Sequence, residues 1–400
     1  MRIGIIGGGA SGLVAAINAV SEDNEVIILE RNEECGKKIL ATGNGRCNYW
    51  NTDQDLSHYE SSTKYLIKEL INDETEKEVL NFFDKLGIIP KIKNGYYYPI
   101  SNQAISIRNT LIDECIDNIV KIHANYLVES IEIKNDKFII NNEEEFDKII
   151  ISTGSFASPK TGSDGMGYKF LRKLGHTIIK PLPSLVQLNT KNYSFLKEWK
   201  GIRSDVEITL VEDGQEIKKQ TGEIQLTDYG ISGICVFNLS NEVSRGLYTN
   251  KKEEILINFL PELTEEQLIN LLSSKRSIRR VLAGILNNKL VEIELNLNSL
   301  KKLDKYNDLS EVKKKELIDT LLRFKVEIES TKSFNESQVS SGGVSLEEIN
   351  LKTMESKLVK NLYITGELLD ITGECGGYNL GIAWRTGIIA GKSSRGDLHD

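Results

Sequence analysis

Six residues near the start of the chain, Gly7-Gly8-Gly9-Ala10-Ser11-Gly12, have the spacing GxGxxG that binds the phosphates of a dinucleotide. The apolar run 2–6 predicts a strand before them, and a helix is predicted from about Ala10 to Val20. The first glycine permits the tight turn, the second lets a pyrophosphate approach the backbone, and the third lets helix and strand pack closely. Free N–H groups and the helix dipole at the helix N-terminus favour the negative charge of the pyrophosphate.

An acidic residue follows at the end of the next predicted strand, 25–30. Glu30 lies 18 residues after Gly12, and a carboxylate at this place accepts hydrogen bonds from the ribose hydroxyls of adenosine. A glycine-rich turn in an ordinary βαβ unit, with no dinucleotide, is the alternative interpretation. The spacing by itself does not distinguish NAD from FAD.

Three later features favour FAD. The strand predicted over 147–152 leads into Ser152-Thr153-Gly154, which resembles the ATG strand of glutathione-reductase-like flavoproteins, and Gly366-Glu367 resembles the Gly-Asp pair that holds the flavin ribityl chain in that class. The stretch 376–381 runs into a helix predicted through Ala390, whose N-terminus would stabilise an anionic reduced flavin. The chain has no second GxGxxG, which favours a flavoenzyme with one dinucleotide domain.

The elements that must position these residues are suggested by where glycine occurs. Five glycines fall in the first twelve residues and eight in the last forty, so we expect the two ends of the chain to meet at one bound cofactor. The region 189–258 has strand-like segments with turns predicted at Asp213-Gly214 and Thr221-Gly222. Residues 262–322 have helical periodicity, with N-caps predicted at Thr264, Ser277 and Ser310, and 324–330 predicts a strand returning to the β-rich part.

Composition limits the classes of function. The net charge is -8 and the sequence pI is about 5.4, which argues against a broad surface for nucleic acid or anionic membranes, so we expect a small-molecule partner. The five cysteines form no CxxC pair, which favours reduced thiols in a cytoplasmic protein. Four scattered histidines, at 58, 123, 176 and 399, predict no metal centre, and no motif specifies an oligomeric state.

Several blocks of sequence together resemble the BaiN-like flavoproteins, a family that includes bile-acid dehydro-intermediate reductases and aminoacetone oxidases. The blocks are Gly36 to Asn48 with its GNGRCN ending, Ser158 to Gly162, Gly222-Glu223 with Thr227 and Gly230 to Gly233, Ser341 to Val344, Gly366-Glu367 with Asp370, and Gly376-Gly377-Tyr378-Asn379. They occur in the order expected for the family and span essentially the whole chain.

The resemblance implies an α/β fold in which a glutathione-reductase-like, Rossmann-type FAD-binding domain is interrupted by a β-barrel and a helical insert. We expect the FAD-binding domain over 1–188 and 336–400, a β-barrel-like substrate domain over 189–260 and 323–335, and the helical insert over 261–322.

The resemblance also places the candidate site residues. Tyr378, Arg46 and Asn48 are expected to be catalytic, as donors to a developing negative charge on a substrate oxygen. The expected cofactor-binding residues are Gly7, Gly9, Ala10, Ser11, Gly12, Glu30, Arg31, Lys38, Gly43, Gly45, Arg46, Cys47, Asn48, Thr153, Gly154, Gly366, Glu367, Gly377, Tyr378 and Asn379.

Four of these interpretations have structural alternatives. Tyr378 is either an acid or a residue that packs against the ring, and Arg46 is either a site cation or a surface cation. Cys47 is either a redox thiol or a small packed residue. The run Tyr96-Tyr97-Tyr98-Pro99, where the family usually has an arginine before an aromatic-proline pair, either lines an apolar pocket or forms an edge strand. Ser152 stands where the family usually has alanine.

The expected activity is that of an FAD-dependent oxidoreductase which uses NAD(P)H to reduce a conjugated C=C bond, such as that of an enone in a steroid or bile-acid-like molecule. Hydride would go to the β-carbon while a donor holds the carbonyl oxygen. One alternative is an amine oxidase that produces peroxide from a substrate like aminoacetone. Another is a flavin-binding regulatory or RNA-associated protein with little turnover.

Overall fold

A computed structural model describes residues 1–396, in two compact units. The first unit comprises Met1–Leu182 and Gln338–Asp400, and the second comprises Pro183–Ser337. Residues 397–400, which end the predicted FAD-binding domain and include His399, lie outside the described residues. Among the residues described, no helix combines the length and apolar character needed to cross a membrane.

The first unit is built on a seven-stranded sheet, and β1, the strand that precedes the glycine-rich turn, is the middle one of its five parallel strands. Five neighbouring strands run parallel, from β22 through β11, β1 and β2 to β7, and β21 and β20 extend the sheet in antiparallel fashion. In sheet order the strands are β20 (Ile349–Asn350), β21 (Glu355–Ser356), β22 (Leu362–Ile364), β11 (Lys148–Ile151), β1 (Arg2–Ile6), β2 (Glu25–Leu29) and β7 (Lys121–His123).

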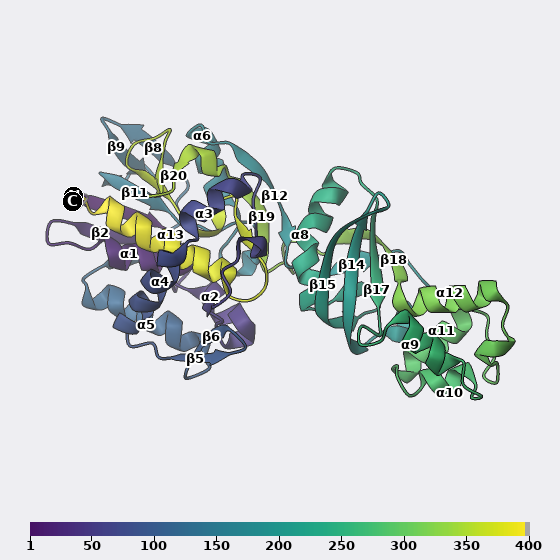
Figure 1. The fold of residues 1–400 in the computed structure, drawn as a ribbon. Coiled ribbons are helices and arrows are strands. Elements are labelled where there is room, and N and C mark those ends of the chain that lie inside the picture. The colour runs from purple at the N-terminus through teal and green to yellow at the C-terminus, as the bar shows by residue number, and fades with distance from the viewer. Residues whose placement is uncertain (397–400) are drawn as a thin grey trace. The chain divides into compact units, whose positions relative to one another are not determined.

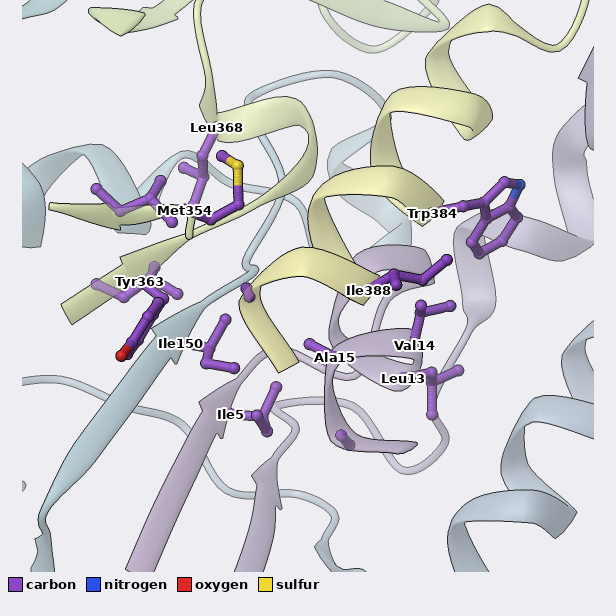
Figure 2. Packing of buried hydrophobic residues seen from close by; sticks show 14 of the residues in the cluster. Ile5, Leu13, Val14, Ala15, Ile150, Met354, Tyr363, Leu368, Trp384 and Ile388 are labelled. Carbon is purple, nitrogen blue, oxygen red and sulfur yellow. The ribbon is translucent and has the colours of Figure 1, made fainter. Parts of the chain in front are cut away.

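Two helices from opposite ends of the chain pack side by side against this sheet, α1 (Ala10–Ala19) and α13 (Tyr378–Ser394), shown in purple and yellow in Figure 1. A Cβ at Gly387 would lie 2.6 Å from the Ser11 carbonyl oxygen, and a Cβ at Gly391 would overlap the Ala15 carbonyl oxygen. Glycine is therefore needed for the two backbones to approach so closely. Figure 2 shows the apolar side chains buried around this contact, among them Ile5, Leu13, Val14, Ala15, Ile150, Trp384 and Ile388.

Smaller elements complete the first unit. The helices are α2 (Lys37–Ala41), α3 (Ile67–Leu70), α4 (Asp73–Lys85), α5 (Ala104–Asp117) and α6 (Met166–Lys173). A three-stranded sheet has the order β10 (Glu144–Phe146), β9 (Lys137–Ile140) and β8 (Ile131–Lys134), and two-stranded sheets pair β12 (Ile178–Ser184) with β19 (Val339–Val344) and β23 (Thr372–Gly373) with β4 (Tyr59–Glu60).

The tyrosine run forms the middle strand of another three-stranded sheet, so the edge-strand alternative is wrong. β6 (Tyr96–Pro99) pairs with β3 (Trp50–Asn51) on one side and β5 (Pro90–Lys93) on the other. Side chains alternate along a strand: Tyr97 is buried against Tyr49, whereas Tyr96 and Tyr98 share the opposite, partly exposed face.

The second unit contains a closed barrel of six strands, which confirms the predicted barrel. Its strands in barrel order are β13 (Leu188–Thr190), β16 (Gly230–Ser232), β15 (Gln215–Leu226), β14 (Arg203–Glu212), β17 (Glu253–Asn258) and β18 (Phe324–Thr331). β18 is the predicted returning strand, and Asp213-Gly214 is the predicted turn between β14 and β15. The turn predicted at Thr221-Gly222 is wrong, because both residues lie inside β15, opposite Glu207 and Val206.

The barrel surrounds its own apolar core, and α8 (Ile234–Tyr248) and α7 (Leu196–Trp199) contribute to it. A separate core joins the helices of the helical insert, α9 (Glu265–Leu272), α10 (Ile278–Leu282), α11 (Asn288–Leu297) and α12 (Glu311–Leu322). Thr264 and Gln267 form the predicted capping box, and the Ser310 hydroxyl caps α12. Ser277 occupies the N-cap of α10 without a side-chain hydrogen bond.

Candidate functional site

The turn between β1 and α1 has the conformation that its glycines predict. Gly7 has φ +100°, and a Cβ at Gly12 would overlap the Gly7 carbonyl oxygen, so neither position accepts a larger residue without strain. At Gly9 the nearest atom to a Cβ would be the Ser152 carbonyl oxygen, 3.9 Å away, so the turn is open there. None of the described side chains caps α1, so the N–H groups at its start are open to a ligand.

Ser152, at the end of β11, supports this turn from the neighbouring strand. Its hydroxyl donates to the carbonyl oxygens of Gly7, at 2.8 Å, and Ile6, at 3.1 Å. An alanine at this position could not make these bonds. The departure from the family pattern therefore adds a contact that holds the glycine-rich turn.

Glu30 is 6% exposed directly after β2, and its carboxylate is held by three donors. Oε2 accepts from the Gly8 N–H at 2.8 Å, and Oε1 accepts from Asn32 through its backbone N–H at 2.8 Å and its side-chain amide at 2.7 Å. The carboxylate is thereby fixed beside the glycine-rich turn. The neighbouring Arg31 forms an ion pair with Asp164.

Glu367, which lies in the short 3-10 helix Gly366–Leu368, connects several segments of the first unit. Its Oε2 pairs with the Lys38 ammonium at 2.5 Å, and its Oε1 accepts from the Ser155 hydroxyl at 2.5 Å and the Ser340 N–H at 2.9 Å. Lys38 and Glu367, predicted on separate blocks, therefore meet in an ion pair.

Thr365, Gly154 and Thr153 also contact other segments of the first unit. The Thr365 hydroxyl hydrogen-bonds with that of Ser11 at 3.1 Å, so the Gly366 block lies at the start of α1. Gly154 has φ +70°, and a Cβ there would overlap the Ser163 hydroxyl. Thr153 is adjacent to the first glycine, because a Cβ at Gly7 would lie 3.0 Å from the Thr153 Cα.

The GNGRCN block is a strained turn after α2. Gly43, Asn44 and Cys47 have φ of 54°, 53° and 56°, and Gly45 has φ 80°. The Arg46 side chain is exposed, with its guanidinium carbon 5.4 Å from the Tyr98 ring centroid and Nε donating to the Gly43 carbonyl oxygen. Asn48 Oδ1 is buried and has no hydrogen-bond partner among residues 1–396.

Cys47 is fully buried within this block. Burial raises the pKa of its thiol to about 12, against a smaller lowering by a hydrogen bond with Thr42. The thiol is therefore protonated at neutral pH, which favours the packed-residue interpretation over a redox thiol, since the thiolate is the reactive form.

The turn before α13 is closed by its own side chains. Asn379 accepts from the Gly373 N–H at 2.9 Å and donates to the Gly373 carbonyl oxygen at 2.7 Å. Gly377, the N-cap of α13, has φ +98°, and a Cβ there would lie 2.9 Å from the Trp50 carbonyl. β3, which follows the GNGRCN block, therefore reaches the start of α13, and none of the described side chains caps this helix end.

Tyr378 is 4% exposed at the first position of α13. Burial raises the pKa of its phenol above the ordinary value, against a hydrogen bond with Asn51 that lowers it. The ring stacks on His58 and meets Tyr59 edge-on, with centroid separations of 4.8 and 5.4 Å. Within residues 1–396, no hydrogen bond joins Tyr378 to Arg46 or Asn48.

Sequence reasoning missed the group around His58. Its Nδ1 lies 2.9 Å from Glu374 Oε2 and its Nε2 lies 3.0 Å from Asp53 Oδ2. Burial lowers the pKa of His58, but the two carboxylates outweigh it, so the pKa is raised above the ordinary value. Asp53 and His58 are close in sequence, whereas Glu374 is 316 residues from His58, so only its place beside the GGYN block could have drawn attention to it.

These features fit a bound FAD. The open turn at Gly9 and the uncapped start of α1 suit a pyrophosphate, and Glu30 is held where a ribose is expected. The uncapped start of α13 and the unpartnered Asn48 oxygen are suited to the polar edge of the flavin ring. No group of three or more His, Cys, Asp or Glu residues in the described part of the chain is arranged to hold a metal ion.

Comparisons with known proteins agree with this assignment. The model of the family described as HI0933-like protein Rossmann domain matches residues 1–393. The chain is 39% identical over 404 residues to 3-dehydro-bile acid delta(4,6)-reductase of Clostridium scindens, covering 98% of each chain. It is 30% identical over 391 residues to ribosomal RNA dihydrouridine synthase of Haemophilus influenzae, covering 95% of each. These matches confirm the family resemblance predicted from the sequence blocks.

A solved structure of 3-ketosteroid delta1-dehydrogenase from Sterolibacterium denitrificans also superposes on this chain. The TM-score is 0.49 and the identity is 10%, over 98% of this chain and 99% of that one.

Proposed function

Since this chain belongs to the family of HI0933-like proteins with a Rossmann domain, we propose that this FAD-dependent oxidoreductase reduces a carbon–carbon double bond conjugated to a carbonyl group. NAD(P)H is the proposed electron donor. The preferred substrate class is a small apolar enone, of the steroid or bile-acid kind. The observation that carries the proposal is the 39% identity with a bile-acid reductase over 98% of both chains.

The names of the two relatives describe one type of chemistry. A delta(4,6)-reductase of a 3-dehydro compound adds hydrogen to double bonds near a ketone, and dihydrouridine differs from uridine by two hydrogens across a double bond next to a carbonyl. Reduction of a conjugated C=C bond is therefore the step we assign to this chain.

The chain's own residues would bind the cofactor and supply donors. The glycine-rich turn and Glu30 would hold the adenosine diphosphate part of FAD. Lys38 and Glu367 would contact its central part, the ribityl chain. When bound, FAD supplies the two-electron transfer. Asn48 and Arg46 are proposed to donate to the carbonyl oxygen as it becomes negative.

Tyr378 is proposed to hold a proton at its hydroxyl. Its burial raises the pKa of the phenol, so the group is a protonated donor throughout the neutral range. Its packing between His58 and Tyr59 fixes the ring in one orientation. These contacts are compatible with an acid role and with a ring-packing role.

A second candidate function is supported by the relative that is 30% identical over 95% of both chains. On that interpretation the reduced C=C bond is that of a uridine base in RNA. The net charge of -8 counts against a broad nucleic-acid surface. The small enone therefore stays the preferred substrate, and RNA is a comparison substrate in the test.

The experiment is anaerobic stopped-flow absorbance of the FAD-loaded protein mixed with NADH or NADPH. Rapid bleaching of the flavin band, followed by reoxidation on adding a steroid enone, is the expected result. If unmodified ribosomal RNA reoxidises the reduced flavin and none of the enones does, the second candidate is favoured. If neither nucleotide bleaches the flavin while aminoacetone does, with peroxide formed in air, the reductase proposal is wrong and the oxidase alternative is favoured.

A further inference from the structure

We propose that His58 is a positioning residue of the candidate site: as an imidazolium held between Asp53 and Glu374, it fixes the turn before α13 and the ring of Tyr378. The inference rests on the proposed function only in taking this turn to flank the bound FAD. It assigns a task to a histidine that the sequence motifs do not include.

The hydrogen-bond geometry favours the doubly protonated ring. Both ring nitrogens face carboxylate oxygens, Nδ1 facing Glu374 at 2.9 Å and Nε2 facing Asp53 at 3.0 Å. A neutral imidazole has one N–H and one bare nitrogen, so one contact would set a lone pair against a carboxylate. With both nitrogens protonated, each contact becomes a charge-assisted hydrogen bond.

The same histidine is joined to the turn by its backbone. Its carbonyl oxygen accepts from the Glu374 N–H at 2.9 Å. The next residue, Tyr59, pairs with Gly373 in the β4–β23 ladder. The ring then stacks on Tyr378 at 4.8 Å with an interplanar angle of 21°. His58 therefore links the segment 53–60, the turn and the first residue of α13.

The charges around the ring favour its proton. Asp53 and Glu374 face it directly, Asp55 lies two residues beyond Asp53, and Tyr59 and Tyr378 contribute neutral phenols. Lys64, which follows this segment, is paired with Glu60. Loss of the proton would leave two carboxylates around one N–H donor and release one side of the turn.

The direction of the pH dependence follows from these contacts. The carboxylates raise the pKa of His58 above its ordinary value of 6.5, against the lowering effect of burial. The stabilisation that these two contacts give the turn is therefore fully present at pH values below 6.5 at which both carboxylates are ionised, and it is lost as the pH rises through the raised pKa. Any reaction that needs the turn loses rate over the same interval.

The test combines a direct titration with a flavin signal. The chain has four histidines, so the ring Cε1–H signals of the full, histidine-labelled, FAD-loaded protein can be followed by NMR from pH 5 to 9. The visible spectrum of bound FAD is recorded over the same range, and kcat wherever turnover is found. The variants are His58→Gln, which carries no charge, and Asp53→Asn, with His123→Gln, a partly buried histidine on β7, as the matched control.

We expect a His58 midpoint above 6.5 and a flavin spectral change with the same midpoint. His123→Gln should keep this spectral change, and His58→Gln should abolish it and lower kcat by roughly tenfold or more, because the turn is misplaced. Asp53→Asn should lower both midpoints by about one pH unit, because it removes one of the two opposite charges. The Asp53 side chain is 61% exposed, so this variant tests the inference even if His58→Gln does not fold.

A His58 midpoint at or below 6.5 would overturn the inference. So would a flavin spectral change that is the same in His58→Gln and the parent protein, or that Asp53→Asn leaves in place. A parent protein that turns over no enone contradicts the proposed function instead, and the NMR and spectral titrations then still decide the role of His58.

Discussion

Gly9 and Gly12 belong to one motif but meet different surroundings. A Cβ at Gly12 would overlap the Gly7 carbonyl oxygen and lie 2.7 Å from the Ser152 hydroxyl, so glycine is required there for the helix to pack on the strand. At Gly9 a Cβ would meet no atom closer than 3.9 Å. Gly12 therefore serves the fold, whereas Gly9 keeps a space open.

We therefore predict opposite results for Gly12→Ala and Gly9→Ala. Gly12→Ala should lower the free energy of unfolding of the FAD-free protein by about 1–3 kcal/mol through overpacking. Gly9→Ala should leave that free energy within about 0.5 kcal/mol and weaken FAD binding at least tenfold, because the methyl group occupies the space for the pyrophosphate. Denaturant unfolding and FAD fluorescence titration measure the two effects. Unweakened FAD binding by Gly9→Ala would contradict this assignment of the turn.

Glu367 is another residue whose surroundings were not visible in the sequence. The resemblance predicts that it contacts the flavin ribityl chain. In the fold it pairs with Lys38 and accepts from Ser155 and Ser340. Its orientation is therefore set by three segments of the chain. A carboxylate fixed in this way contacts a ligand with little loss of side-chain entropy.

Among the elements, β17 places two adjacent glutamates in opposite environments. Glu253 is 1% exposed and lies opposite Glu212 on β14, while Gly246 of α8 leaves room for its carboxyl group. Burial, followed by the charge of Glu212, raises the pKa of Glu253 to about 8. Its neighbour Glu254 pairs with Lys252 at 2.8 Å and Lys325 at 3.0 Å, and these bonds outweigh burial and lower its pKa.

These two glutamates should affect stability with opposite signs. Protonated Glu253 is favoured in the folded protein. The stability that this gives the fold is fully present below the ordinary pKa of 4.5 and is lost as the pH rises to about 8. Glu253→Gln should therefore raise the unfolding temperature relative to the parent protein at pH 8.5, with little effect at pH 4.5. Glu254→Gln, the matched control, should lower it at pH 8.5. Thermal unfolding at both pH values checks the pair, and a lower unfolding temperature of Glu253→Gln at pH 8.5 would contradict the assignment.

For the whole molecule, the order of segments along the chain differs from their grouping in space. The first unit takes its sheet strands from residues 1–151 and 349–364, and its two packed helices come from opposite ends of the chain. The second unit lies between them in sequence and has separate apolar cores in its barrel and its helices. Each unit therefore has the buried apolar surface that independent folding requires.

We predict that the second unit can be removed without loss of FAD binding. The Ser345 N–H donates to the Thr177 carbonyl oxygen, and a Cβ at Gly342 would lie 2.5 Å from the Lys180 carbonyl oxygen. The residue numbers fall along β19 as they rise along β12, so the two strands run in opposite directions. Leu182 and Gln338 are therefore at the same end of this pair, and a short glycine-serine linker can join them. The joined first unit should bind FAD, and the isolated segment 183–337 should unfold cooperatively without it. Flavin absorbance and circular dichroism test both, and a joined unit that is folded but free of FAD would contradict the prediction.

The sequence by itself determined the local features of this protein. Hydrophobic periodicity and glycine spacing predicted β1, α1, the GxGxxG turn, Glu30 after β2, the capping box at Thr264 and the strand that returns to the barrel, because each depends on neighbours a few residues apart. The family and the α/β fold with its inserts followed from blocks that occur in a fixed order. The predicted turn at Thr221-Gly222 failed because glycine also occurs inside strands, where cross-strand pairing decides.

Only the tertiary structure decided how distant residues combine. The Lys38–Glu367 ion pair, the Thr365–Ser11 hydrogen bond and the contact of Gly377 with Trp50 each join segments more than 300 residues apart. The contact of His58 with Glu374, 316 residues away, belongs to the same group, and no local pattern indicated it. Such contacts are set by the packing of both chain ends around one sheet, and local sequence patterns carry no information about which remote side chains that packing brings within hydrogen-bond distance.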